Sequence, residues 1–360
     1  MSDSQLEPPV PVKQSRLGVA LKMLASLTVT AVMLECTIRT VHVFRPLNFV
    51  HTNSYDRFRA KPHAQDWNFT LNSRGFKDLE FGPKQAGKFR ITALGDSFAY
   101  GVVPYDSNYL TLLEEGLRQH LGDVEVLNMG IPALGPGEYL DIFTLEALPL
   151  EPDLVLLSFF IGNDFSETRR QRRWYKRSTV MMFLRYLYVI GTQYEGRVIH
   201  DPGEYCDTCP AFTEDAYLKL EKRRSAIYLV QDPTLDGLID DAVSNLTRIR
   251  DACREKGIPF LVVLIPDELQ VSESLRDAVI ERFYPSLREG EWDTTKPNRA
   301  LAARLAEERI DFKDLLVDLQ RAAQGEPVYR PRDTHWNRAG NRVAASVLEP
   351  WVRSEIRESP

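Results

Sequence analysis

The chain has 360 residues, of which 43% are hydrophobic and 27% are charged, and it carries a formal net charge of −6 at pH 7. This composition is ordinary for a globular protein and excludes collagen-like, low-complexity and wholly disordered classes. The mild acidity argues against a nucleic-acid partner, because nucleic-acid-binding proteins usually carry a basic surplus.

The first segment with a clear pattern lies close to the N-terminus. Residues 1–16 are polar and contain prolines, so we expect a disordered tail. The apolar run Leu17–Leu34 follows, interrupted only by Lys22, and its length approaches the roughly 20 residues that a membrane-spanning helix needs. No small-residue cleavage site comes after it. We therefore predict an uncleaved single-pass signal anchor, a transmembrane helix over residues 17–38; the alternative is a buried core helix.

After a turn-rich connector over residues 39–87, strands and helices alternate along the chain. This alternation predicts β-α-β units in a parallel sheet with helices on both faces. A stretch at about residues 166–230 interrupts it and is expected to form an insertion. The predicted strands are Lys88–Leu94, Val124–Leu127, Asp153–Phe160, Pro259–Ile265 and Ile310–Phe312, and the predicted helices are Asn108–Leu121, Tyr139–Leu148, Leu235–Lys256, Ala300–Glu308 and Ala339–Ile356.

Chemically useful side chains and glycines follow three of these strands. Ser97 follows the first, Gly130 the second and Asn163 the third, and the segment Asp333–Asn337 precedes the last helix. Because ligands of such sheets bind at the carboxyl ends of the strands, we expect a hydroxyl, a glycine amide, a carboxamide and an imidazole to converge there. This set of groups is what acyl transfer needs.

Each of these groups has a defined part in that chemistry. A serine hydroxyl needs a base, and histidine is the usual one. Of the six histidines, only His335 lies in a post-strand loop beside a carboxylate, that of Asp333, which can orient the imidazole. The oxyanion hole would use the backbone N–H groups of Ser97 and Gly130 and the side-chain amide of Asn163.

Each feature also has a structural interpretation. The segment Gly95–Ser97 can be a simple turn, Asn163 can cap a helix, and His335 can be a buried histidine with satisfied hydrogen bonds.

Four motifs resemble those of the SGNH/GDSL hydrolase superfamily over about residues 88–352. They are GDSFAYG at 95–101, NMG at 128–130, GND at 162–164 and DTHWN at 333–337, and LNSRGFK at 71–77 looks like the preamble of membrane-anchored bacterial members. The resemblance implies a flavodoxin-like three-layer α/β/α sandwich over residues 88–357. It also implies a catalytic triad of Ser97, His335 and Asp333, an oxyanion hole of Ser97, Gly130 and Asn163, and no cofactor or metal.

The implied activity is a serine esterase that hydrolyses an acyl, most simply acetyl, ester of a carbohydrate or lipid. The Asp-x-His spacing resembles the branch that includes exopolysaccharide O-acetylation proteins. This keeps open an O-acetyltransferase of cell-envelope polysaccharide, and a non-catalytic carbohydrate-binding member is a third alternative. The basic residues that flank the anchor lean toward a cytoplasmic N-terminus, which would place the catalytic domain outside the cytoplasm, at the bacterial inner membrane.

The predicted insertion holds two further features. Arg169–Arg177 has six basic residues in nine and precedes the apolar run Thr179–Ile190, which is too short to span a bilayer. We interpret the pair as a membrane-surface element, as a guide for an anionic polysaccharide, or as a solvated basic helix with one packed face. Cys206 and Cys209 can form a disulfide outside the cytoplasm or remain free thiols.

Overall fold

The computed structural model describes residues 16–44, 59–167, 178–193, 196–198 and 204–358. The chain divides into two compact units, one formed by residues 1–52 and 172–192 and the other by residues 53–171 and 193–360. The expected disordered tail, apart from its last residue, and the basic run at 169–177 lie outside the described residues.

The larger unit is built on a parallel five-stranded sheet. Its strands lie in the order β4-β3-β5-β6-β7, which is the flavodoxin-like order, and neighbouring strands are all parallel. The strands are β3 (Phe89–Gly95), β4 (Val124–Gly130), β5 (Leu154–Phe160), β6 (Phe260–Ile265) and β7 (Asp311–Asp314). The predicted α/β fold with a parallel sheet is therefore confirmed.

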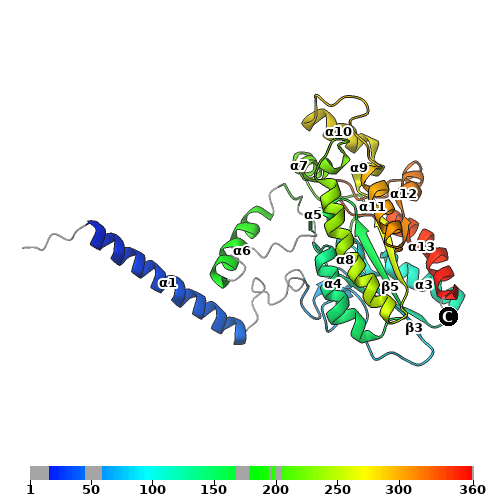
Figure 1. Ribbon diagram of the computed structural model, residues 1–360, viewed down its shortest axis with the longest axis horizontal. Helices are drawn as coiled ribbons and strands as arrows, with labels where there is room; N and C mark the ends of the chain where they lie inside the picture. Colours follow the sequence, from blue (N-terminus) through cyan, green and yellow to red (C-terminus); the bar gives the residue numbers. More distant parts are fainter. Residues whose placement is uncertain (1–15, 45–58, 168–177, 194–195, 199–203, 359–360) are drawn as a thin grey trace, which may run out of the picture. The chain divides into compact units, whose positions relative to one another are not determined.

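Helices cover both faces of this sheet, as Figure 1 shows. Successive residues of a strand point to opposite faces, and in β6 Val262 joins one buried apolar cluster while Val263 joins the other. This is why β5 and β6 are apolar at every position except Ser158. One face is packed by α3 (Tyr109–Leu121), α12 (Leu316–Ala323) and α13 (Arg338–Glu358), and the other by α4 (Pro136–Ile142), α8 (Leu235–Glu255) and α11 (Lys296–Glu307).

Several elements differ from the expectation. The predicted helix Tyr139–Leu148 is a regular α-helix only as far as Ile142, and the chain then forms a π-helical turn and a 3-10 turn. Pro149 cannot donate the hydrogen bond that a longer α-helix needs. The predicted connector contains a small hairpin. Elements not foreseen are β1 (Gln65–Asp66), β2 (Phe69–Thr70), α7 (Glu214–Arg224), α10 (Glu273–Phe283), α12 and the short helices α2 (Ser97–Tyr100), α5 (Asp164–Glu167) and α9 (Glu268–Val271).

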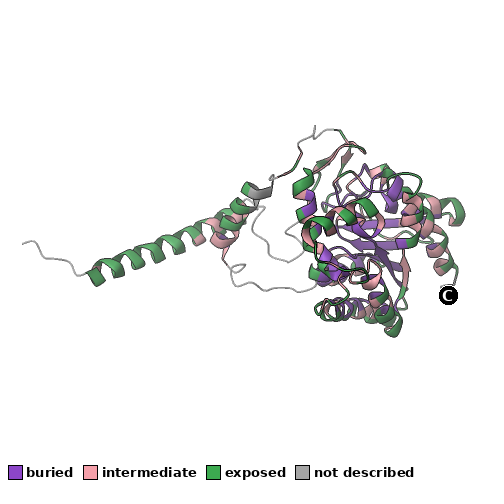
Figure 2. Ribbon diagram, turned by 90° about the horizontal axis from the view of Figure 1, so that it is seen from above, coloured by how far each residue is buried: buried purple, intermediate pink, exposed green. Residues whose placement is uncertain are grey.

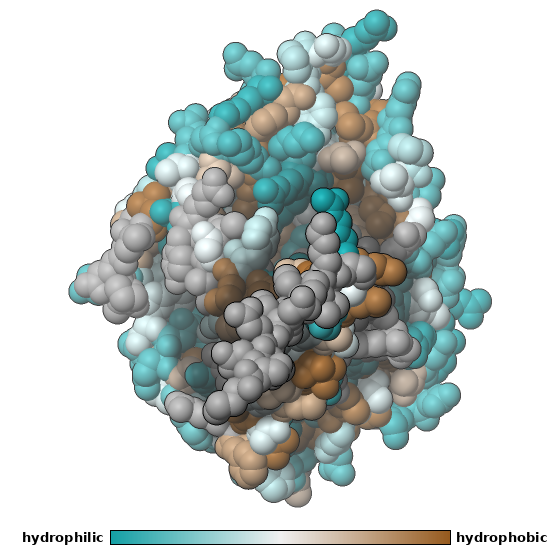
Figure 3. Space-filling view, turned by 90° about the vertical axis from the view of Figure 1, so that its left-hand side faces the viewer, coloured by the Kyte–Doolittle hydropathy of each residue, from teal (hydrophilic) through white to brown (hydrophobic). Residues whose placement is uncertain are grey.

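The smaller unit holds two helices, α1 (Arg16–Phe44) and most of α6 (Thr179–Gln193). By length and composition α1 can cross a membrane, and none of its 29 residues is buried; Figure 2 shows most of it as exposed. Hydrophilic side chains dominate the periphery of the face drawn in Figure 3.

Candidate active site

Ser97 lies directly beyond the carboxyl end of β3, as the first residue of α2. The preceding Asp96 is fully buried and caps this helix, because its Oδ1 accepts the Phe98 N–H at 2.9 Å. Burial also raises the pKa of the Asp96 carboxyl above its ordinary value. At Gly95 an added Cβ would meet the Ala99 Cβ at 2.7 Å. The glycine therefore lets α2 turn back tightly onto the strand and holds Ser97 at the edge of the sheet.

The structure brings Ser97, His335 and Asp333 into one hydrogen-bonded chain. The Ser97 Oγ lies 2.8 Å from the His335 Nε2, and the His335 Nδ1 lies 2.7 Å from the Asp333 Oδ1. Ser97 and His335 are 238 positions apart in the sequence. The short Asp-x-His spacing is sufficient, because the Asp333 carboxylate reaches the ring nitrogen and also accepts the His335 backbone N–H at 3.3 Å.

The Asp333 carboxylate is ionised in this setting. Its residue is only 6% exposed, and burial by itself would raise the pKa. The neighbouring His335 and Arg330 outweigh that effect and lower the pKa of Asp333 below its ordinary value. The Arg330 Nη1 lies 2.7 Å from the second carboxylate oxygen, so both oxygens have partners.

Two further residues of the DTHWN motif hold the histidine loop in place. The Trp336 side chain is buried and meets the rings of Phe98 and Tyr109 edge-on, at centroid distances of 5.0 and 5.7 Å. The Asn337 side chain donates to the Pro327 carbonyl at 2.7 Å and accepts the Gly340 N–H at 2.9 Å, which caps α13. Trp336 thus holds the loop against the core, and Asn337 holds it at the start of α13.

The three candidate oxyanion donors are not equivalent. The Gly130 N–H already donates to the Asn128 Oδ1 at 2.9 Å, and a Cβ at this glycine would lie 2.1 Å from the Tyr100 backbone nitrogen. Gly130 therefore allows α2 to approach β4, and its amide is engaged. The Ser97 N–H lies in the first turn of α2, beside the Ser97 hydroxyl.

Asn163 follows β5 and lies just before α5. Its Oδ1 is buried without a hydrogen-bond partner among the described residues. The preceding Gly162 is required, because a Cβ there would lie 2.4 Å from the Phe160 ring and 3.1 Å from the Asp267 Oδ2.

A buried polar network supports the loop that holds Asp333 and His335. The Arg224 Nη1 donates to the Thr334 Oγ1 at 2.6 Å and lies 3.3 Å from the Glu221 Oε1. Glu221 and Asp267 are fully buried, and burial raises the pKa of both carboxyls. Thr334 stands between Asp333 and His335, so this network holds their loop at its centre. This network was not predicted, because α7, which carries Glu221 and Arg224, was not foreseen.

A disulfide loop lies beside the same segment. Cys206 and Cys209 are joined by a disulfide. The Tyr205 ring has Arg330 at 5.3 Å and Arg338 at 4.8 Å from its centroid. The loop therefore packs against both sides of the histidine segment.

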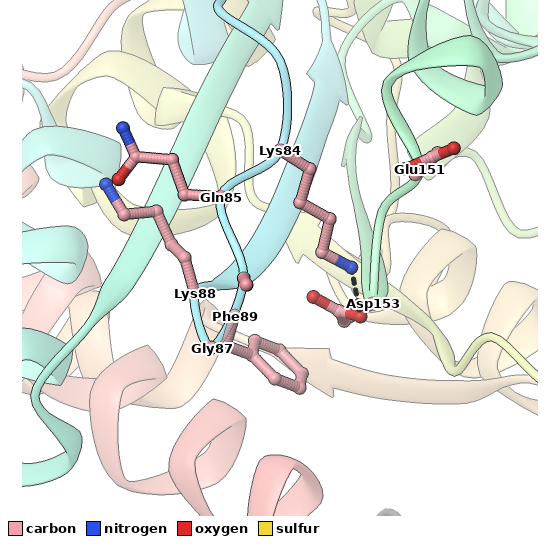
Figure 4. A pocket seen from close by; sticks show the side chains of 8 residues that line it. Lys84, Gln85, Gly87, Lys88, Phe89, Glu151 and Asp153 are labelled. Carbon is pink, nitrogen blue, oxygen red and sulfur yellow. Dashed lines mark hydrogen bonds and ion pairs between the residues drawn. The ribbon is translucent and has the colours of Figure 1, made fainter.

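A separate hollow of about 490 Å³ lies elsewhere on the larger unit. It is lined by residues at the amino ends of the strands, including Lys84, Phe89 and Asp153, and Figure 4 shows Lys84 paired with Asp153. The catalytic candidates lie at the carboxyl ends, so this hollow is not part of their site.

Comparison with known proteins gives a family match for the C-terminal part of the chain. Residues 226–359 match a family described as "SGNH hydrolase-like domain, acetyltransferase AlgX". This range includes Asp333 and His335. No curated protein matches the sequence.

Solved structures similar to the chain include that of TesA, that of an acetyl xylan esterase and that of an aryl esterase. TesA is 13% identical, with 74% of this chain and 98% of TesA covered and a TM-score of 0.41. The acetyl xylan esterase AlAXEase is 14% identical, with 73% and 100% covered and a TM-score of 0.42. The aryl esterase of M. smegmatis in its inhibitor-bound form is 17% identical, with 74% and 99% covered and a TM-score of 0.37.

Proposed function

We propose that the chain is a serine esterase of the SGNH/GDSL type that hydrolyses an acyl ester of a carbohydrate or lipid, and the match of residues 226–359 to an SGNH hydrolase-like family supports this proposal. The observation that carries this proposal is the unbroken chain from the Ser97 Oγ through His335 to Asp333, with contacts of 2.8 and 2.7 Å. A nucleophile and a base must lie within this reach for the proton to move.

In the proposed reaction, the His335 Nε2 removes the Ser97 proton while the Oγ attacks the ester carbonyl. The Asp333 carboxylate stabilises the imidazolium that forms. The imidazolium then gives its proton to the departing alcohol, leaving an acyl group on Ser97. Water, activated by His335, attacks this acyl-serine and releases the acid.

The developing oxyanion needs donors that are already in place. We assign this role to the Ser97 N–H and the Asn163 side-chain amide. Gly130 joins them only if its amide leaves the Asn128 Oδ1, where it is bound at 2.9 Å.

A second candidate is an O-acetyltransferase, and the match of residues 226–359 to the AlgX acetyltransferase family favours it. Both reactions pass through the same acyl-Ser97. They differ in the acceptor, which is water for the esterase and a hydroxyl group of a cell-envelope polysaccharide for the transferase.

One experiment separates these possibilities. The full-length protein in detergent is incubated with p-nitrophenyl acetate, with and without oligosaccharide acceptors, beside its Ser97→Ala variant. An esterase gives acetate at the same rate with or without acceptor, whereas a transferase gives acetylated sugar and a faster release of p-nitrophenol. Equal turnover by wild type and Ser97→Ala contradicts both, and no turnover with no phosphonate labelling points to a non-catalytic carbohydrate-binding protein.

We also propose that α1 is an uncleaved membrane anchor over residues 17–38 and that the catalytic domain, residues 88–357, lies outside the cytoplasm at a bacterial inner membrane. The Cys206–Cys209 disulfide supports this placement, because disulfides persist in oxidising compartments. The protein should remain in the membrane fraction at full length after a carbonate wash, with its C-terminus open to protease from the outer side. Recovery of a soluble form trimmed near residue 36 contradicts the anchor.

A further inference from the structure

Lys77 is a fully buried lysine in the segment that precedes the sheet, with a side chain that is 0% exposed. Its Nζ donates hydrogen bonds to the Gly101 carbonyl at 2.8 Å and to the Val103 carbonyl at 2.5 Å, and it lies 2.6 Å from the Asp66 Oδ2. An ammonium group has three donors, and here each of them has an acceptor. A buried charge is costly unless it is paired and hydrogen-bonded, so this set of acceptors is what a buried lysine requires.

The surroundings of Lys77 favour its charged form. The Nζ lies 4.5 Å from the centroid of the Trp67 ring and 5.2 Å from that of the Tyr100 ring, and aromatic faces attract cations. Burial lowers the pKa of the Lys77 ammonium below its ordinary value, and the Asp66 carboxylate opposes this effect. Asp66 belongs to β1, and Trp67 follows it in the turn that leads to β2. Lys77 therefore connects the small hairpin to the segment that follows α2.

Lys77 acts on the C-terminal end of α2, the helix whose first residue is Ser97. The last carbonyls of a helix have no partners within it. At this end the Tyr100 carbonyl accepts a hydrogen bond from the Asn108 side-chain amide at 3.1 Å, and the Gly101 carbonyl accepts one from Lys77. The helix dipole also favours a cation at this end. A helix of a single turn is not stable by itself, so α2 depends on these outside partners.

Two contacts relate Lys77 to the Ser97 hydroxyl. The Gly101 N–H donates to the Ser97 carbonyl at 3.0 Å, which joins Gly101 to Ser97 across the single turn of α2. Val102 lies between the two carbonyls that Lys77 holds, and it lines a small cavity of about 10 Å³ together with Ser97 and His335. Movement of Gly101 or Val102 would therefore shift both the Ser97 side chain and the wall beside it.

We propose that Lys77 is a positioning residue for the nucleophile, because its ammonium fixes the end of α2 and thereby holds the Ser97 Oγ within reach of His335. This rests on the proposed esterase activity. The contact of 2.8 Å between the Ser97 Oγ and the His335 Nε2 depends on the place of a one-turn helix, and a misplacement of about 1 Å can cost about 10²-fold in rate. The segment before the sheet is then part of the scaffold of the active site and not only a connector.

Arg90 provides a matched control, because it is a second buried cation with the same kinds of partner. Its side chain is 2% exposed, and its Nε lies 2.6 Å from the Glu125 Oε1. Its Nη1 and Nη2 donate to two backbone carbonyls at 2.7 and 3.0 Å. Like Lys77, it therefore holds one carboxylate and two carbonyls. Arg90 stands near the amino end of β3, however, whereas Ser97 follows the carboxyl end of the same strand.

The test compares Lys77→Met with Arg90→Met in the full-length protein in detergent. Each substitution keeps an unbranched apolar side chain and removes the charge, so both should lower Tm. For Lys77→Met we also expect kcat with p-nitrophenyl acetate to fall by about 10²-fold per folded molecule with little change in KM, and labelling of Ser97 by a fluorophosphonate to slow by a similar factor. Arg90→Met should keep both rates close to those of wild type at temperatures below its melting transition.

Equal kcat values and equal labelling rates in the two folded variants overturn the proposal and make Lys77 a structural residue only. A rise in KM with unchanged kcat also overturns it, since that result removes a binding interaction and not the placement of Ser97. Absence of both turnover and Ser97 labelling in the wild type refutes the esterase itself, and this role of Lys77 with it.

A milder pair of variants serves if Lys77→Met does not fold. Lys77→Gln and Arg90→Gln lose the charge but retain two N–H donors for the carbonyls. The glutamine side chain is shorter than that of lysine, so Lys77→Gln should still lose more kcat and more labelling rate than Arg90→Gln does. Equal rates in this pair overturn the proposal in the same way.

Discussion

Replacing Asp333 by asparagine removes the negative charge of the triad while keeping its size. The lost quantity is the attraction between this carboxylate and the imidazolium that forms on His335 during the reaction. At the observed Nδ1–Oδ1 distance of 2.7 Å, two unit charges in an effective dielectric of about 20 attract by about 6 kcal/mol. This is an upper limit, because the amide oxygen of asparagine still accepts one hydrogen bond.

We therefore expect Asp333→Asn to lower kcat/KM by about 10³–10⁴, equal to about 4–5.5 kcal/mol of transition-state stabilisation. The assay is steady-state hydrolysis of p-nitrophenyl acetate, with circular dichroism and thermal unfolding to confirm the fold. The fold of the variant must be checked because the substitution also leaves Arg330, whose side chain is 11% exposed, without its carboxylate partner.

A matched control is Asp318→Asn. The Asp318 carboxylate also lies near an arginine three positions away, Arg321, but at 3.4 Å and on the surface, so its loss should change neither activity nor stability by much. A folded Asp333→Asn variant with kcat/KM within tenfold of wild type would refute the reasoning and show that another acid serves His335.

Three further predictions follow from individual contacts. Asn163→Ala should lower turnover by about 10²–10³ with little change in Tm; unchanged turnover in steady-state assays makes Asn163 a structural residue. Gly130→Ala should sharply lower Tm or solubility, because its Cβ would lie 2.1 Å from the Tyr100 nitrogen, whereas Gly237→Ala in α8 meets nothing within 4 Å and should keep or raise Tm; equal melting curves contradict this. Burial raises the pKa of the Cys253 thiol to about 12, so at pH 8 it should resist maleimide until the protein is denatured; rapid labelling of the native protein, seen by mass spectrometry, contradicts this.

The sheet was predictable because its central strands are buried on both faces. The runs that became β5 and β6 are apolar at every position except Ser158, and no other arrangement of such short runs buries both sides as well. The order of the strands could not be read from the sequence alone, since it depends on which strands pair. Helix α12 was missed because its eight residues give too few turns for a clear periodic pattern.

The convergence of Ser97, His335 and Asp333 was predictable from two different signals. Ser97 follows the parallel strand β3 and therefore lies at the carboxyl edge of the sheet. The segment with Asp333 and His335 was expected in a loop after a strand, but it lies between α12 and α13, so its place beside Ser97 was indicated by the DTHWN motif and not by a strand end. The engagement of the Gly130 N–H by Asn128 was not predictable, because it depends on a side-chain rotamer two residues away. Arg330 was equally hidden, since surface arginines are common and only the fold shows that this one faces Asp333.

The most direct test of the account is the reaction of the full-length protein with a fluorophosphonate, read by intact mass and by peptide sequencing, together with turnover of p-nitrophenyl acetate. The account predicts one phosphonyl group per chain on Ser97, strongly slowed labelling in His335→Ala, and loss of nearly all turnover in both Ser97→Ala and His335→Ala. The double variant should be little worse than either single variant, because the two residues act as a unit. Labelling at another residue, or turnover in Ser97→Ala within tenfold of wild type, would contradict the claim that Ser97 is the nucleophile.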